Sequence, residues 1–308
     1  MNQIETITSL HLRNEVQFFT FSLEENGDVY AMNIFKIKEI LKYQGKVVEI
    51  GSEIPFIEGI INVRNITIPV VDLRKWFFYD GTNKDLSEYG IKSKDYLVMI
   101  CDFSGVLVAV RIYKAYGLLI KSWDEFVRND NISSHQKIIG YVKEKDKIIQ
   151  IVDMEKMVDE AFGIEEAKLK EMDVVTELGI KDKYILVADD SKSVLNVMER
   201  IMKKLGVKYM LFKNGEELID FIFSIPKEKI FAIITDLEMP KKSGFEVIKQ
   251  VKNSSYKDIP IIVNSSMSGK SNEEMAKSLN ADGFVSKSNP VEIEKFLRNF
   301  INESTDNT

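Results

Sequence analysis

Apolar and polar positions follow two different rhythms along the chain. Up to about residue 158, short apolar or alternating runs are separated by turn residues, a pattern typical of strands joined by hairpins. We therefore predict a mostly-β first half, barrel-like, with helical periodicity only near residues 35–42 and 154–162. The predicted strands lie in the runs VQFFTFSL, VVEIG, ITIPVVDL, YLVMICDFSGVLVAVRI and KIIGYVKEKDKIIQIVD.

After residue 183 the chain alternates between short apolar runs and amphipathic stretches of helical length. Alternation of this kind predicts a doubly wound α/β domain, in which helices cover both faces of a five-stranded parallel sheet. Between the two halves, residues 164–182 are rich in acids and lysines at i, i+4 spacing, which favours a helical linker. We predict domains at 1–163 and 183–308, with strands at 184–188, 209–212, 231–235, 259–264 and 283–286.

Composition narrows the class of protein. Hydrophobic residues make up 44% of the chain and charged residues 29%, which is globular rather than disordered. No apolar run approaches the roughly 20 residues of a membrane helix, and the start, MNQIETITSL, lacks the basic segment of a secretory signal. A single cysteine, Cys101, suggests a reducing compartment, so we expect a cytoplasmic protein without membrane insertion. A net charge of −6 with interspersed signs argues against a nucleic-acid partner.

Chemically useful side chains follow the strands of the second half. Asp189 and Asp190 end the first strand, Asp236 the third, Ser265 the fourth and Lys287 the fifth. In a parallel sheet these ends share one edge, so the side chains are expected to converge on one pocket. The carboxylates would hold Mg²⁺, with Mn²⁺ as an alternative ion, and Asp236 suits a nucleophile that forms an aspartyl-phosphate. Taken alone, acids at strand ends can also be solvated loop residues or helix N-caps.

The motifs ILVADDS, IITDLEMPKKSGFEVI, PIIVNSS and ADGFVSK resemble receiver domains of two-component response regulators over residues 183–303. The resemblance implies that Asp236 is the phosphoacceptor and that the ion is held by Asp189, Asp190, Asp236 and the Glu238 backbone carbonyl. It further implies a role for three residues: Ser265 and Phe284 as a switch pair and Lys287 as a contact of the acyl phosphate.

Two departures from the receiver pattern stand out. Family members usually have proline directly after the lysine, whereas Ser288 and Asn289 precede Pro290 here. Phe284 replaces the commoner tyrosine, so the switch is expected to work by packing alone.

The first half resembles CheW-type chemotaxis coupling domains over about residues 12–160, most specifically in EGIINVRNITIPVVDLR. That family folds as two small β-barrels and bridges chemoreceptor tips to a histidine kinase. Ile37, Glu39 and Arg64 match positions that contact receptor or kinase, although a core residue and two solvated charges remain an alternative reading. Asn65 stands where the family usually has glycine, and asparagine tolerates the left-handed backbone of such a turn.

The order of the two domains resembles the CheV-type family of coupling proteins. It implies a signalling adaptor rather than an enzyme, located at receptor arrays and tuned by phosphorylation of Asp236. Two alternatives remain: a phosphate sink localised by the coupling half, and a haloacid-type phosphohydrolase. The last places a second acid two residues after its nucleophile, where this chain has Ser191 or Lys192.

Overall fold

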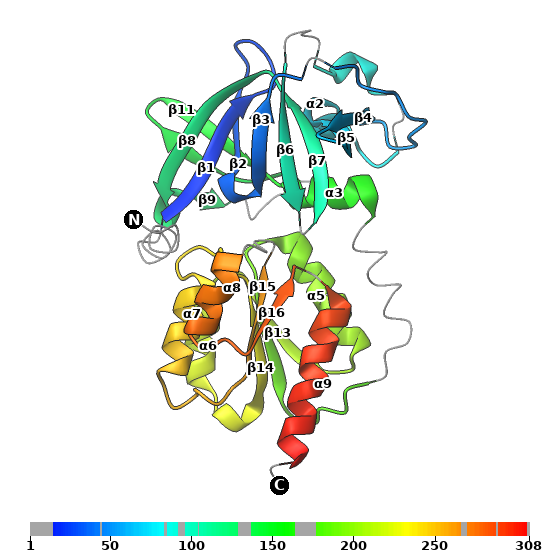
Figure 1. Ribbon diagram of the computed structural model, residues 1–308. Helices are drawn as coiled ribbons and strands as arrows, with labels where there is room; N and C mark the ends of the chain where they lie inside the picture. Colours follow the sequence, from blue (N-terminus) through cyan, green and yellow to red (C-terminus); the bar gives the residue numbers. More distant parts are fainter. Residues whose placement is uncertain are drawn as a thin grey trace. The chain divides into compact units, whose positions relative to one another are not determined.

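The computed structural model describes residues 15–43, 45–82, 85–91, 96–103, 105–128, 137–163, 177–265, 270–287 and 289–306. The chain forms two compact units, of which one spans Val16–Gly163 and the other contains the described residues from 177 onward (Figure 1). Within the described ranges, no helix is both long enough and apolar enough to cross a bilayer.

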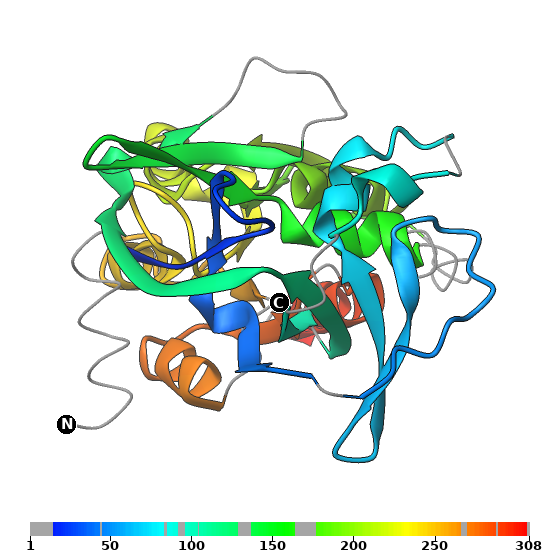
Figure 2. The ribbon, with the colours of Figure 1, turned by 90° about the horizontal axis from the view of Figure 1, so that it is seen from above.

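The first unit contains two β-sheets, each with its own apolar core. The six-stranded sheet has the order β8-β1-β2-β11-β10-β9, in which β2 and β11 are parallel. Its strands curve around an interior filled by residues such as Phe18, Ala31 and Ile151 (Figure 2). The strand bounds are β1 (Glu15–Ser22), β2 (Val29–Asn33), β8 (Lys114–Ser122), β9 (Val127–Arg128), β10 (Ile138–Glu144) and β11 (Lys147–Val152).

The second sheet of this unit has the order β3-β6-β7-β5-β4 and packs Ile68, Val98 and Ala109 into its core. The predicted double β-barrel is thereby confirmed. Its strands are β3 (Ile37–Leu41), β4 (Ile57–Val63), β5 (Ile66–Asp72), β6 (Leu97–Phe103) and β7 (Val106–Ile112). The unit also contains α2 (Leu73–Phe78), α3 (Met154–Phe162) and the 3-10 turns η1 (Ile34–Lys36), η2 (Ser87–Tyr89) and η3 (Trp123–Glu125).

Two local predictions for this half are wrong and one is confirmed. The helix expected at residues 35–42 is only the η1 turn followed by strand β3, because β3 pairs antiparallel with β6. The VVEIG run forms no strand, since only Val48 bridges to Ile60. The helix predicted at 154–162 is α3, whose C-terminal cap, Gly163, adopts the left-handed conformation that glycine permits.

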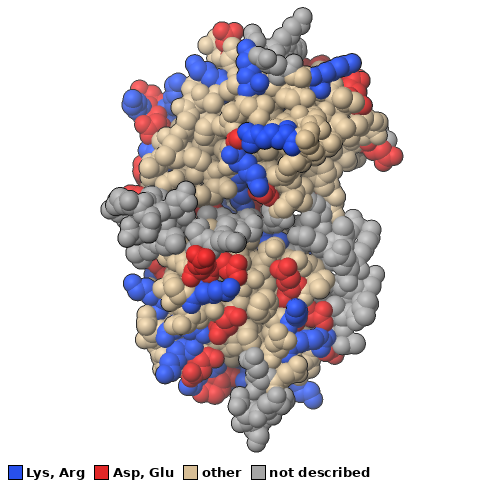
Figure 3. Space-filling model, viewed as in Figure 1, with Lys and Arg blue, Asp and Glu red and all other residues tan. Residues whose placement is uncertain are grey.

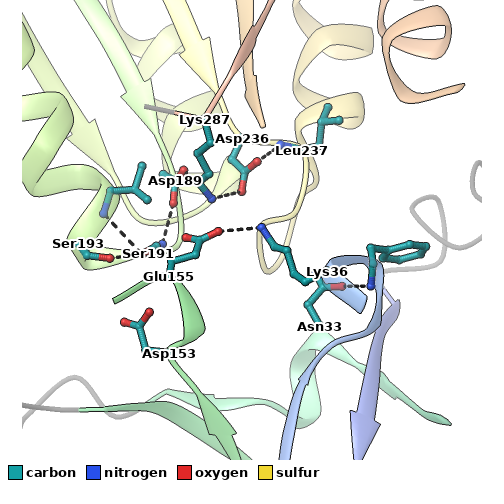
Figure 4. Close-up of polar contacts among 12 residues, drawn as sticks. Asn33, Lys36, Asp153, Glu155, Asp189, Ser191, Ser193, Asp236, Leu237 and Lys287 are labelled. Atoms are coloured by element: carbon teal, nitrogen blue, oxygen red, sulfur yellow. Dashed lines mark hydrogen bonds and ion pairs between the residues drawn. The ribbon is translucent and has the colours of Figure 1, made fainter. Parts of the chain in front are cut away.

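Helix α3 is tied to the rest of the first unit at two points. The Lys36 ammonium lies 2.8 Å from the Glu155 carboxylate at the helix start (Figure 4). Near the helix end, the buried Trp76 indole donates a 2.7 Å hydrogen bond to Glu160. Lys36 lies in η1, the turn that connects β2 of the first sheet to β3 of the second, and Trp76 lies in α2, which follows β5 of the second sheet. These contacts therefore hold α3 against both halves of the unit.

The second unit has one five-stranded parallel sheet in the order β13-β12-β14-β15-β16. Helices α5 and α9 pack on one face, and α6, α7 and α8 on the other (Figure 1). This confirms the predicted doubly wound domain. The bounds are β12 (Tyr184–Ala188), α5 (Lys192–Lys204), β13 (Lys208–Phe212), α6 (Gly215–Ser224), η5 (Lys227–Lys229), β14 (Ile230–Thr235), α7 (Gly244–Lys252), β15 (Ile261–Ser265), α8 (Lys270–Ser278), β16 (Gly283–Ser286) and α9 (Pro290–Asp306).

Several boundaries differ from the sequence prediction: β13 and β14 each begin one residue earlier, and β15 ends one residue later, at Ser265. Strand β15 begins at Ile261 rather than at residue 259, because Pro260 has no N–H and takes part only by accepting a bond from Ile233. Most of the predicted linker, residues 164–176, lies outside the described residues. Its remaining part, 177–182, is not helical, and Leu178 is buried in the core beneath α5. The predicted domain limits at 163 and 183 stay predictions.

Lys137 closes the C-terminal end of α2. Its ammonium donates to the backbone carbonyls of Trp76 and Tyr79 and lies 5.1 Å from the Trp76 ring. The side chain is buried, and desolvation is the main cause that lowers its pKa to about 8. Among nearby charges, Glu160 opposes this shift and Lys156 adds to it.

The lowered pKa of Lys137 predicts a stability that rises with pH. Between pH 8 and 10.5 the unfolded chain binds more protons at this lysine than the folded chain does, so the unfolding free energy increases across that window. Across this window, the unfolding free energy of wild type should rise by at most about 3 kcal/mol relative to that of Lys137→Met. Denaturant unfolding followed by tryptophan fluorescence isolates this unit, because both tryptophans, Trp76 and Trp123, belong to it. The prediction would be contradicted if the difference in unfolding free energy between wild type and Lys137→Met stayed constant from pH 7.5 to 10.

Candidate functional site

The parallel sheet of the second unit brings two strand ends together. Asp189 directly follows β12 and Asp236 directly follows β14, the neighbouring strand. The Asp236 backbone N–H donates a 2.9 Å hydrogen bond to the Ala188 carbonyl, so the strand pairing continues to the residue that carries the acid. Both aspartates are buried, at 0% and 3% exposure, while Asp190 is half-buried. The sheet therefore holds two carboxylates out of bulk water.

Asp189, Asp190 and Asp236 form one acidic cluster. Each offers a carboxylate oxygen, and these oxygens all lie within 4.8 Å of one another. The Lys287 ammonium lies 3.0 Å from Asp236 Oδ2 and 3.2 Å from Asp189 Oδ2, so it bridges the two buried acids (Figure 4). Four of the five side chains that the sequence predicts to converge, all but Ser265, are thus brought together here.

The chain's own backbone orients the two buried carboxylates. Asp189 Oδ1 accepts a 2.8 Å hydrogen bond from the Ser191 N–H, and Asp236 Oδ1 accepts one of 2.8 Å from the Leu237 N–H (Figure 4). Each acid consequently turns its second oxygen, Oδ2, toward Lys287. Ser191 in turn caps α5, so the helix start supports the acidic loop.

The donor set of the cluster fits a hard divalent cation. Three carboxylates converge beside the Lys287 ammonium. Like charges at this separation repel unless a cation or a proton offsets them. Mg²⁺ prefers oxygen ligands, usually one or two carboxylates together with waters, so a cluster of three carboxylates supplies suitable donors.

Ser265 and Phe284 lie on the same face of the sheet. Ser265 is the last residue of β15 and is 1% exposed. Phe284 lies on β16 in register with Val263, two residues before Ser265, so the serine and the phenylalanine share a face. The Phe284 ring is half-buried and lines a surface pocket between α8 and α9. Glu238 follows the site on a half-buried loop.

The three residues assigned to partner contact lie in the second sheet of the first unit. Ile37 is half-buried at the start of β3. Glu39 and Arg64 form a 2.7 Å ion pair, and Arg64 keeps 79% of its side chain exposed. Arg64 and Asn65 both have positive φ, so the β4–β5 turn adopts the left-handed backbone expected for asparagine. The two charges are thus paired with each other rather than separately solvated.

Comparison with known proteins identifies both halves. Residues 17–162 match the CheW-like domain family, and residues 185–298 match the response regulator receiver domain family. The chemotaxis protein CheV1 of Helicobacter pylori is 45% identical over 312 residues, covering 97% of each chain. The chain belongs to the CheV family of chemotaxis proteins.

Further relatives support the CheV assignment. CheV2 of the same organism is 39% identical over 312 residues, covering 97% of this chain and 98% of that protein. The chemotaxis protein CheW of Bacillus subtilis is 29% identical over 140 residues, which are 44% of this chain and 82% of that protein. A CheV-family chain thus joins a CheW-like coupling domain to a receiver domain and serves chemotaxis signalling as an adaptor.

One residue of the CheV receiver was missed by the sequence analysis. Gly244 begins α7 against the backbone of Asp236, where a Cβ atom would lie 2.1 Å from the Asp236 carbonyl oxygen. Its N–H donates to the Leu237 carbonyl at 3.0 Å, and Ser243 with Glu246 forms a capping box. The spacing Ser-Gly-x-Glu could have indicated a helix start. Only the fold reveals that this start touches the acidic site.

Substitution of Gly244 is expected to disturb the site. Gly244→Ala forces the α7 start away from Asp236, and such overpacking costs about 1–3 kcal/mol of receiver stability. Thermal unfolding followed by circular dichroism should show an earlier receiver transition, and Mn²⁺ binding should weaken. Gly51→Ala is the control, because a Cβ atom there meets nothing within 4 Å. Equal behaviour of the two variants would show that the close approach does not matter.

Proposed function

We propose that this chain couples chemoreceptors to a histidine kinase and that Mg²⁺-dependent phosphorylation of Asp236 modulates the coupling. The observation that carries the proposal is the Lys287 ammonium held between the Asp189 and Asp236 carboxylates within the acidic cluster. Such an arrangement has a nucleophilic oxygen, a dication site and a fixed cation at one point. It is what an aspartyl-phosphate requires.

Each residue of the site has a separate role in the proposed phosphoryl transfer. An Asp236 carboxylate oxygen attacks the phosphorus, the P–N bond to a kinase phosphohistidine breaks, and the nitrogen keeps the electron pair. Bound Mg²⁺, held by Asp189, Asp190, Asp236 and the Glu238 carbonyl, would supply charge compensation for the phosphoryl oxygens. Lys287 then turns its ammonium from the carboxylate to a phosphoryl oxygen.

The change of state is proposed to pass through Ser265 and Phe284. The Ser265 hydroxyl would donate a hydrogen bond to the new phosphoryl group. Phe284 shares its sheet face and has a half-buried ring, so it can repack toward the space that the hydroxyl leaves. With no phenol oxygen on this ring, packing alone carries the signal. The chain acts in this scheme as phosphoacceptor and adaptor, without turnover of a separate substrate.

The partners follow from the coupling half. We propose a chemotaxis histidine kinase and the cytoplasmic tips of chemoreceptors, contacted through Ile37, Glu39 and Arg64, which places the protein in the cytoplasm at receptor arrays. Lys and Arg side chains interleave with Asp and Glu on the face shown in Figure 3. Mixed charge of this kind suits protein partners better than a phosphate backbone.

Label transfer tests the phosphoacceptor. Incubation with phosphorylated kinase and Mg²⁺ should label wild type, whereas Asp236→Asn should lose more than about 99% of the label because the amide cannot act as the nucleophile. Asp258→Asn, on an exposed loop, is the matched control and should label normally. Chelation of Mg²⁺ should suppress labelling. Full labelling of Asp236→Asn would refute the assignment.

An acyl-phosphate mimic separates modulation from simple storage of phosphate. With beryllofluoride bound, the affinity of the chain for receptor and kinase should change. An unchanged affinity would instead favour the phosphate sink, in which the coupling half only localises the receiver. Turnover of small phosphate esters would favour the phosphohydrolase.

Charge reversal tests the coupling surface. The exposed Glu39–Arg64 pair contributes at most about 1 kcal/mol to stability, so Glu39→Lys or Arg64→Glu should leave the fold intact. Each should nevertheless weaken partner binding about tenfold by placing a wrong charge in the interface. Lys38→Glu provides a neighbouring control on the same strand. Binding to receptor and kinase can be measured by co-sedimentation, and unaltered binding of both variants would contradict the assignment.

A further inference from the structure

Strand β16 is the edge strand of the receiver sheet, so only one of its sides is paired with another strand. On the inner side, the Lys287 N–H donates a 3.1 Å hydrogen bond to the Ser265 carbonyl. The preceding N–H, that of Ser286, points to the outer side, because alternate residues of a strand present their N–H groups to opposite edges. The backbone that carries Lys287 thus has an open side next to the acidic cluster.

The Glu292 carboxylate covers this open side. Its Oε2 atom accepts a 3.1 Å hydrogen bond from the Ser286 N–H. Glu292 lies in the first turn of α9, where its own N–H donates to the Asn289 side chain at 3.2 Å. Asn289 also donates its backbone N–H to the Ser286 carbonyl at 3.0 Å. Two hydrogen bonds therefore join the end of β16 to the start of α9, and the third, between Glu292 and Asn289, holds the first turn of the helix.

We propose that Glu292 is a positioning residue for phosphoryl transfer, acting by fixing the backbone from which Lys287 reaches the site. This inference rests on the proposed function, because Lys287 must matter for phosphorylation of Asp236. The strand end is held from both sides, by the Ser265 carbonyl and by the Glu292 carboxylate. Loss of the outer contact frees the Ser286 peptide to rotate.

The position of the Lys287 backbone determines whether its ammonium reaches both carboxylates. Its ammonium bridges Asp189 and Asp236 at 3.2 and 3.0 Å, and a backbone shift of about 1 Å at Lys287 would break one or both contacts. Displacements of that size at a catalytic group can cost up to about 100-fold in rate. We expect a smaller effect, because a flexible lysine partly compensates.

Self-phosphorylation of the full chain with radiolabelled acetyl phosphate and Mg²⁺ measures the effect without a kinase. Glu292→Leu should lower the initial labelling rate about tenfold, and Glu292→Asp, too short to reach Ser286, should lower it several-fold. Glu292→Gln keeps an acceptor oxygen and should stay within about twofold of wild type. The matched control is Glu294→Leu, since Glu294 pairs with Arg298 at 2.6 Å and leaves β16 untouched. It should label like wild type.

Repeating the Glu292 substitution in the Lys287→Ala variant distinguishes an effect on the position of Lys287 from a general loss of stability. If Glu292 acts through Lys287, Glu292→Asp should have no further effect once Lys287→Ala is present, whereas independent effects would multiply. Multiplying effects, or a Glu292→Asp rate equal to wild type, would overturn the inference. Absence of label on wild type itself, or equal labelling of Asp236→Asn, would instead overturn the proposed function. Glu292→Asp keeps the charge and the helix start, so it serves if Glu292→Leu fails to fold.

Discussion

The receiver domain depends on one interaction: the Lys287 ammonium shared between two buried carboxylates. Burial of Asp189 and Asp236 side by side is unfavourable by itself, because like charges repel and desolvation adds to the cost. The lysine offsets part of that cost, and the three carboxylates beside it form a donor set that suits a dication. Since the lysine directly follows the edge strand β16 and the acids directly follow the inner strands β12 and β14, the same contact ties the end of β16 to the middle of the sheet. Chemistry and stability therefore use the same three side chains.

The coupling domain is built differently, since each of its two sheets has its own apolar core. Lys36 and Trp76 hold the two ends of α3 through Glu155 and Glu160. Among the described residues, α3 is the last element of the coupling unit along the chain. The helix at the C-terminal limit of this unit thus contacts both of its halves.

Much of the fold and most of the candidate site could be predicted from local patterns. Strands β12 and β16 begin and end where alternation of apolar runs placed them, and Asp189 and Lys287 follow them as expected. The failures have a common cause. Strand β3 carries a pattern compatible with a helix, and its pairing with β6, some 60 residues away, overrides that preference. Gly244 and Glu292 escaped notice because their partners, the Asp236 carbonyl and the Ser286 N–H, are backbone atoms that no side-chain pattern reveals.

The sequence by itself determined which chemical groups stand at the strand ends, and hence that a receiver follows a coupling domain. That much is local, because the period of the apolar residues defines the strands and the residue after each strand faces the common edge. Tertiary structure alone decided which oxygen of each aspartate meets Lys287, how closely α7 approaches Asp236, and that Arg64 meets Glu39. These are distances between atoms far apart in the chain, and only packing of the sheets and helices sets them.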